Sequence, residues 1–266
     1  MAELLIDRPV RAEASPHSEP SLAALADELG YTPDWNWSWN SYRAVIERIS
    51  GAYRLRRHLE IGGGRDPLFT PDEARQLGID VTLNDISEAE LARAPAAFSK
   101  VRCDVATADT MTVLRPGGYD FAYSRMVMEH VRDVRQLWRN QHAMLAPGGV
   151  ALAFFPTLYA PAFALNRLVP EALSSAIVSR LFPDRHGEGD NPKFPAFYDY
   201  CYGDAAKVVP MLTDAGFGEV LLLPFYGYSY FWKIPGLREV DAAFTRFTRA
   251  RDWRTFTSFA YLIARK

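Results

Sequence analysis

Cysteine is scarce in this sequence, and long apolar runs are absent. The chain of 266 residues has two cysteines, Cys103 and Cys201, which lie far apart and form no CxxC pair. This excludes a disulfide-based scaffold and a thiolate zinc site of ordinary spacing. No run approaches the roughly 18 apolar residues of a membrane helix, and the N-terminus lacks the layout of a secretory signal. We therefore expect a cytoplasmic protein that keeps its thiols reduced.

A strong charge of either sign is also lacking. Lys and Arg number 30 against 32 Asp and Glu, which gives a net charge of −2. No overall field attracts the chain to nucleic acid or to an anionic membrane, so neither a nucleic-acid partner nor stable membrane insertion is expected, and a local basic patch is left open. With 48% hydrophobic and 23% charged residues, the chain can bury a large core, and general disorder is excluded.

Hydrophobic periodicity divides the first part of the chain into alternating elements. Residues 1–40 form an N-terminal arm with one short helix over 21–29, and a second helix runs from about residue 40 to 52. The patterns then predict short strands over 57–61, 80–85, 100–104, 120–124 and 150–155, separated by helices with caps at Thr70 and Ser87. Such alternation indicates a doubly wound, Rossmann-like α/β fold with a mostly parallel sheet.

The alternation breaks at residue 156. Residues 156–203 contain an amphipathic segment over 163–181 and an aromatic run over 194–202, and we interpret them as an inserted helical cap. The pattern then resumes with a helix over 204–215, a strand over 219–224, a helix over 239–248 and a strand over 255–264. The main domain thus comprises residues 41–155 and 204–266.

A glycine-rich turn carries the strongest chemical signal. Gly62, Gly63 and Gly64 follow the predicted strand 57–61, where glycines let a ligand approach the backbone amides. A dinucleotide fold would place a third glycine where this chain has Pro67, and no Gly-Lys-Ser or Gly-Lys-Thr of a phosphate loop occurs. Glu60, just before the glycines, would repel a phosphate but attract an ammonium group. A zwitterionic ligand is favoured, and a tight turn without a ligand is the alternative.

Acidic residues end the next two strands as well. Asp85 ends the strand over 80–85, at the separation where a carboxylate can accept both ribose hydroxyls. Asp104 and Val105 end the following strand, where an acid and a backbone amide could bind adenine. Asp104 could instead cap a turn. Together these residues indicate a nucleoside that carries an amino acid.

In these segments the sequence resembles the class I S-adenosylmethionine-dependent methyltransferases. The matching segments, in chain order, are residues 59–64, 84–87, 104–105, 119–124, 128–131, 145–149 and 215–217. The resemblance implies a seven-stranded sheet and S-adenosylmethionine as cofactor. The cofactor-binding residues it implies are Glu60, Gly62, Gly63, Gly64, Asp85, Ile86, Asp104, Val105 and Ser124. Ser124 could equally be a strand-end hydroxyl bonded to the backbone.

The resemblance implies methyl transfer to a small-molecule acceptor, with O-methylation favoured. Methylation of RNA or protein is a second interpretation, and a dehydrogenase or a non-catalytic S-adenosylmethionine-binding protein are two others. His130 follows the fourth strand and is the candidate general base, or it bonds a neighbouring loop instead. Ubiquinone-pathway O-methyltransferases place a metal-binding acid where this chain has Met126, so no metal is expected.

Aromatic residues suggest where an acceptor could bind. Trp35, Trp37 and Trp39 alternate with polar residues, which on an extended segment would place all three indoles on one side. Trp37, Tyr198 and Tyr200 are the candidate substrate contacts, for an acceptor that is bulky and partly apolar. Packing of the arm and of the cap is the alternative for these residues. A homodimer is left open.

Overall fold

The computed structural model describes residues 19–160, 195–232 and 234–266 of the chain. Its strands form one sheet in the order β3-β2-β1-β4-β5-β7-β6, in which β7 runs antiparallel to both of its neighbours and the other pairs are parallel. The strands are β1 (Arg57–Ile61), β2 (Asp80–Asp85), β3 (Ser99–Arg102), β4 (Tyr119–Arg125), β5 (Leu145–Pro156), β6 (Glu219–Phe225) and β7 (Phe259–Arg265). The predicted doubly wound fold with a mostly parallel, seven-stranded sheet is confirmed.

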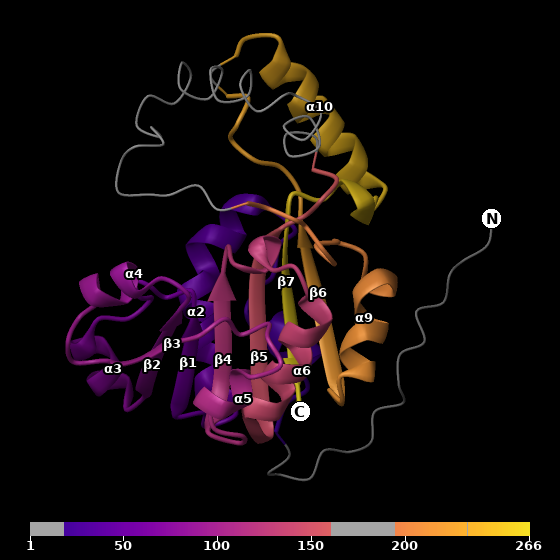
Figure 1. Cartoon of the computed structure of the whole chain (residues 1–266). Coiled ribbons are helices and arrows are strands. Elements are labelled where there is room, and N and C mark those ends of the chain that lie inside the picture. The colour runs from indigo at the N-terminus through magenta and orange to yellow at the C-terminus, as the bar shows by residue number, and fades with distance from the viewer. Residues whose placement is uncertain (1–18, 161–194, 233) are drawn as a thin grey trace.

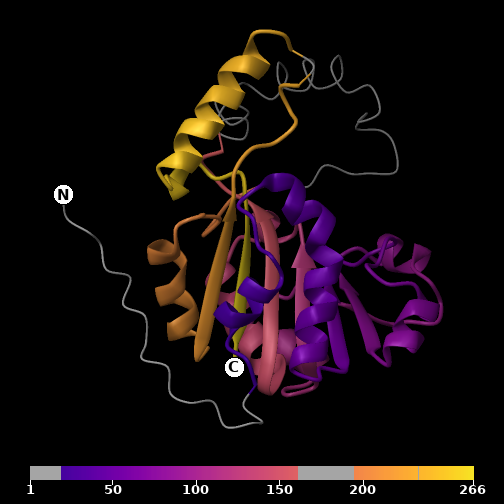
Figure 2. The same ribbon diagram turned by 180° about the vertical axis from the view of Figure 1, so that it is seen from behind.

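Helices cover both faces of the sheet, α1 and α2 on one side (Figure 2) and α6 and α9 on the other (Figure 1). The helices are α1 (Leu22–Glu28), α2 (Trp35–Ala52), α3 (Pro71–Leu77), α4 (Glu88–Arg93), α5 (Thr110–Val113), α6 (Val134–Met144), α9 (Ala205–Asp214) and α10 (Leu237–Ala250), with 3-10 turns η1 (Met128–His130) and η2 (Arg254–Phe256). Side chains alternate along each strand, so Phe121 and Tyr123 of β4 join the core beneath α2 and Ala122 joins the core beneath α6. Both faces are therefore buried, as a parallel sheet requires.

Local sequence signals explain where several helices begin. Thr70 caps α3 with a complete capping box, in which the Glu73 side chain bonds back to Thr70. Ser87 caps α4 by accepting from the Glu90 amide, and Asp204 caps α9 by accepting from the Ala206 amide. These caps lie close to the starts predicted from the sequence.

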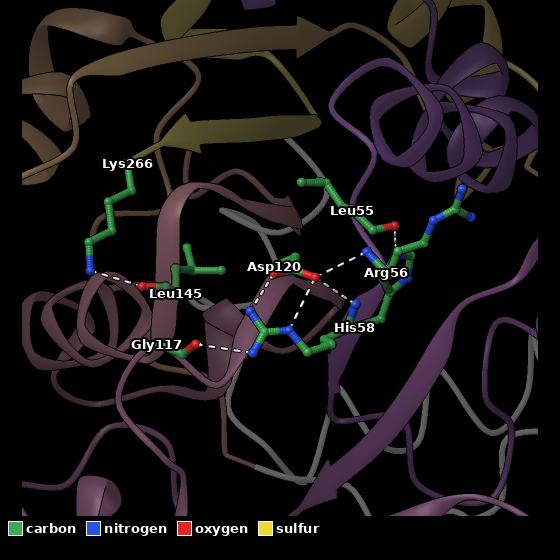
Figure 3. Close-up of polar contacts among 8 residues, drawn as sticks. Leu55, Arg56, His58, Gly117, Asp120, Leu145 and Lys266 are labelled. Carbon is green, nitrogen blue, oxygen red and sulfur yellow. Dashed lines mark hydrogen bonds and ion pairs between the residues drawn. The ribbon is translucent and has the colours of Figure 1, made fainter.

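The amino ends of β1 and β4 are joined by Asp120 (Figure 3). Its carboxylate accepts from the backbone amides of Arg56 at 3.1 Å and Arg57 at 2.9 Å, and from the Arg57 guanidinium at 2.6 Å. In the same view, Lys266 donates to the carbonyl of Leu145 at 2.9 Å, which fastens the end of β7 to the start of β5. These contacts hold the sheet at the edge opposite to the predicted site.

The structure corrects two of the predicted elements. Trp35, Trp37 and Trp39 lie in α2 and not on an extended segment, because Asp34 caps the helix before them and residue 40 lies well inside it. The three indoles therefore do not share one side, since a helix turns by about 100° per residue. The last strand begins at Phe259, and part of the stretch before it forms η2.

The inserted segment is only partly described. The predicted amphipathic segment over 163–181 and Phe194 lie outside the described residues. None of the helices in the described parts of the chain has the length and hydropathy of a membrane span. Beyond the carboxyl ends of the strands lies α10, which is visible at the top of both whole-chain views (Figures 1 and 2).

Candidate functional site

The glycine turn lies directly against the segment that follows β4. Gly62 has φ +71°, and a Cβ atom placed on it would lie 2.4 Å from Cγ2 of Val127. Two features therefore favour glycine at this position. The left-handed backbone is unfavourable for residues with a side chain, and a Cβ atom would displace Val127. The turn is thus built for close backbone approach between the ends of β1 and β4.

Asn84 holds this turn to the ends of β2 and β3. Its carbonyl accepts from the amides of Gly62 at 2.8 Å and Gly63 at 3.2 Å. Its side-chain nitrogen donates to the carbonyls of Val101 at 3.1 Å and Cys103 at 3.0 Å. Asn84 is 2% exposed, so these bonds are buried. The sequence analysis included Asn84 only within the matching segment 84–87 and did not predict these bonds, although a polar residue inside an otherwise buried parallel strand is a signal for them.

Asp85 lies beside the glycine turn, as predicted. One carboxylate oxygen accepts from the Ser87 amide at 2.8 Å, and the other lies 3.1 Å from the position of a Cβ atom on Gly64. Burial raises the pKa of Asp85, and the nearby Glu90 carboxylate adds to that effect. The next side chain, Ile86, is 53% exposed and offers apolar surface next to the carboxylate.

Glu60 lies under the glycine turn, where a Cβ atom on Gly63 would lie 3.0 Å from Glu60 Cγ. Both of its carboxylate oxygens lie 3.0 Å from the backbone nitrogen of Leu68, which donates to them. Burial raises the pKa of Glu60 to about 7. The carboxylate thus also organises the loop between the turn and α3.

Asp104 and Val105 are held by local bonds at the end of β3. The Asp104 side chain accepts from the Ala106 amide at 2.9 Å, which is the turn-capping role that sequence reasoning had left open. Val105 is buried, and its carbonyl accepts from the Asn140 side chain at 2.9 Å. Both residues lie at the same edge of the sheet as Asp85, because β2 and β3 are parallel.

The segment after β4 contains a buried acid. Glu129, in η1, is 5% exposed, and its Oε2 atom has no hydrogen-bond partner among the described residues. Burial raises the pKa of Glu129 to about 8. Ser124 at the end of β4 is also buried and pairs in register with Ile61.

His130 lies next to Glu129 and is bonded to the inserted segment. Its Nδ1 atom lies 2.9 Å from the carbonyl oxygen of Pro195, and its Nε2 atom lies 3.8 Å from Glu129 Oε1. A carbonyl can only accept, so Nδ1 carries a hydrogen, and in the neutral ring Nε2 is left as the acceptor. The bond to the Pro195 carbonyl therefore does not prevent Nε2 from acting as a base.

Residues 195–202 pack onto the segment after β4. The amides of Phe197 and Tyr198 donate to the Glu129 carbonyl at 2.7 and 3.1 Å. The Arg135 guanidinium lies 4.9 Å from the centre of the Tyr200 ring. Tyr198 and Tyr200 have φ values of 57° and 52°, a left-handed conformation that is uncommon for such side chains. The structure thus places Tyr198 next to Glu129 and Tyr200 against Arg135 of α6.

Trp37 lies elsewhere. Its ring stacks on Phe225 of β6 at 5.8 Å and contacts Tyr31 and Tyr261 at 5.8 and 6.1 Å. These contacts place it against the core between α2 and the β6–β7 part of the sheet. Among the described residues, no three His, Cys, Asp or Glu side chains gather as metal ligands would.

Together these residues form one site at the carboxyl ends of β1, β2, β3 and β4. A glycine turn, a half-buried carboxylate and an exposed apolar side chain fit a nucleoside that carries an amino acid, because a carboxylate at a strand end can accept ribose hydroxyls and the turn lacks the Gly-Lys-Ser or Gly-Lys-Thr of a phosphate loop. A histidine with one basic nitrogen lies on the same edge. Such a site can bind a nucleoside that carries an amino acid. Its histidine can take a proton from a second bound molecule.

Comparisons with known proteins agree with this interpretation. A family model described as a methyltransferase domain matches residues 37–181, more than half of the chain. Phosphoethanolamine N-methyltransferase 2 from Haemonchus contortus, in complex with S-adenosyl-L-methionine, has a similar fold, with a TM-score of 0.53 and 15% identity over 86% of this chain and 52% of that enzyme. A methyltransferase from Archaeoglobus fulgidus has a TM-score of 0.49 and 16% identity over 88% of this chain and 100% of the other.

The chain spans about half the length of the Haemonchus enzyme. No curated protein sequence matches it. The family match, the strand order and the site at the carboxyl edge are mutually consistent. The chain belongs to the methyltransferase-domain family.

Proposed function

We propose that the protein transfers the methyl group of S-adenosylmethionine to a small-molecule acceptor, with oxygen as the favoured nucleophile. The proposal rests on the contacts of two neighbouring residues. Asn84 forms hydrogen bonds to the glycine turn and to the end of β3, and the Asp85 carboxylate lies next to Gly64. The Haemonchus enzyme binds S-adenosylhomocysteine and phosphomonomethylethanolamine in a second structure, with a TM-score of 0.52 to this chain. Transfer to nitrogen is therefore the second form of the proposal.

Each predicted binding residue has a proposed part in holding the cofactor. Glu60, Gly62, Gly63 and Gly64 would hold the amino-acid part, Asp85 the ribose hydroxyls, and Ile86, Asp104 and Val105 the adenine, with Ser124 at the end of β4. The bound cofactor would supply an electrophilic methyl group on a positively charged sulfur. The protein's task is then to orient the acceptor and exclude water, which can account for much of the catalysis.

His130 is proposed to receive the proton that the acceptor loses. The Pro195 carbonyl fixes the hydrogen on Nδ1, which leaves Nε2 as the proton acceptor. Glu129, whose Oε1 atom lies 3.8 Å from Nε2 and whose raised pKa of about 8 keeps it protonated at neutral pH, would hold the ring in place by contact. Glu129 is in this scheme a positioning residue.

The acceptor is proposed to be bulky and partly apolar. Tyr198 and Tyr200 are the candidate contacts, and the left-handed backbone of both residues, with Tyr198 bonded to Glu129, supports a functional role. The contacts of Trp37 favour packing for that residue. The net charge of −2 supports a small molecule over RNA. Cys103 and Cys201 are free thiols, which supports a cytoplasmic location.

Titration calorimetry tests the binding half of this proposal. We expect S-adenosylmethionine and S-adenosylhomocysteine to bind at one site and NADH not to bind. Binding of NADH alone would overturn it. Turnover of a panel of small hydroxylated and amino acceptors then tests the chemical half, and binding without turnover of any acceptor would indicate a non-catalytic protein.

A His130→Ala variant tests the proposed base. We expect kcat to fall across the neutral pH range while the affinity for S-adenosylhomocysteine is unchanged, because His130 acts on the acceptor. Wild-type turnover at every pH would remove His130 from the mechanism.

A further inference from the structure

Helix α10 carries an apolar stripe that is left exposed in the described part of the chain. Leu237, Val240 and Phe247 are 37%, 66% and 43% exposed. They lie on one side of the helix, since positions 3, 7 and 10 residues apart share a face. A helix that serves only its own domain buries such a stripe against the core.

The inner face of α10 is polar instead. Asp241 accepts from the Tyr228 hydroxyl at 2.5 Å, and Thr248 is 1% exposed. A Cβ atom on Gly227 would lie 3.4 Å from the methyl group of Thr245. Asp241, Thr245 and Thr248 are four and three residues apart, so they lie on one face, and this face packs against the protein. Attachment through a polar face leaves the apolar stripe for an external partner.

Tryptophan and arginine side chains flank the helix that carries the stripe. Trp232 and Trp253, which are 55% and 46% exposed, lie in the segments before and after the helix. The Arg251 guanidinium lies 3.9 Å from the centre of the Phe247 ring, which in turn contacts Trp253 at 5.5 Å. Residues 237–254 contain five arginines and three acids, a surplus of positive charge in a chain whose net charge is −2.

We propose that this surface, comprising Leu237, Val240, Phe247, Arg251 and Trp253, docks α10 on an anionic lipid membrane. Exposed apolar side chains, flanking tryptophans and arginines are the features of helices that lie in the membrane interface. A second copy of the chain fits less well, because a two-fold contact would place each arginine-rich patch against its own copy. The protein would then bind at the membrane surface without spanning it.

Sedimentation with lipid vesicles tests the proposal on the full chain. We expect binding to vesicles that contain phosphatidylglycerol, weak binding to vesicles of phosphatidylcholine alone, and loss of binding in high salt. The double variant Val240→Ser and Phe247→Ser should reduce the partition coefficient about tenfold or more. Arg246→Glu with Arg251→Glu should do the same through charge.

Matched surface substitutions provide the controls. Val113→Ser removes an apolar side chain that is 52% exposed on α5, and Arg139→Glu reverses an exposed charge on α6. Both should bind vesicles like the wild type. The proposal is overturned if the wild type does not bind or if the α10 variants bind equally well. It is also overturned if the serine variant lowers the melting temperature by several degrees, or dissociates a dimer, since the stripe would then be covered by protein.

Discussion

At the residue scale, the site depends on side chains that bond backbone groups of neighbouring strands. Asn84 bonds the turn after β1 and the end of β3, and Glu60 bonds the Leu68 amide. Such buried bonds fix the turn before a ligand arrives, so the site is largely preorganised. Asp85 differs, since one of its oxygens bonds Ser87 and the other faces Gly64.

The variant Asp85→Asn tests the role of this second oxygen. The amide can still accept from the Ser87 amide, so α4 should keep its start, but a charged acceptor is lost. We expect the affinity for S-adenosylhomocysteine to fall by about 1 to 3 kcal/mol, the cost of losing a hydrogen bond to a charged group. Calorimetry measures this change. Asp109→Asn, at a position with no side-chain cap bond, is the control, and equal affinities in the two variants would refute the ribose assignment.

Residue types and their order at strand ends sufficed to predict Glu60, the glycines and Asp85 as neighbours, because parallel strands end at one edge. The role of Glu129 could not be predicted in this way. Its burial is created by residues 197–201, which are distant in sequence and pack over η1. A single carboxylate before a histidine carries no signal of such a tertiary contact.

At the scale of elements, the glycine turn is constrained by both its dihedral angle and its neighbour. Gly62 and Gly30 have similar φ values of +71° and +64°, but a Cβ atom on Gly30 would meet nothing within 4 Å. Alanine variants of these two glycines therefore separate the free-energy cost of a left-handed backbone from the cost of the contact with Val127.

We expect Gly30→Ala to lower the free energy of unfolding by about 1 to 2 kcal/mol, the cost of a left-handed alanine. Gly62→Ala should lower it further and also weaken cofactor binding, because Val127 must move. Urea unfolding and calorimetry measure the two effects. If both variants lose the same stability and Gly62→Ala binds S-adenosylhomocysteine normally, the turn does not need this close approach.

Element boundaries were predictable where caps and burial agree. The strands β1 and β2 match the predicted residues 57–61 and 80–85. Residues 35–40 show why other boundaries could not be predicted. Their alternating Trp and polar residues have the period of a strand, but the Asp34 cap starts a helix there. The residues before β7 likewise have strand-forming side chains but fold into η2.

At the scale of the whole molecule, Glu129 links stability to pH. Its pKa is raised from 4.5 to about 8 in the folded protein, so the folded state binds the proton more tightly than the unfolded chain does. The stability that this proton contributes is complete below about pH 4.5 and is lost as the pH rises through about 8.

We therefore expect Glu129→Gln to raise the melting temperature relative to the wild type at pH 8.5 more than at about pH 5, because the amide cannot ionise. Thermal unfolding followed by circular dichroism across this pH range measures the difference. Glu88→Gln, on an exposed carboxylate, is the surface control. A difference between Glu129→Gln and the wild type that does not change with pH would show that Glu129 is not buried as a neutral acid.

The strand order also has a consequence for how the chain folds during translation. The ribosome makes β7 after every other described strand, yet β7 lies between β5 and β6 and pairs with both. Until residues 259–265 leave the exit tunnel, β6 has no partner in the sheet and β5 has an open edge. The sheet of the nascent protein cannot be completed before this strand is available. A stalled or truncated product would therefore expose the unpaired edges of β5 and β6, which can pair with strands of other chains.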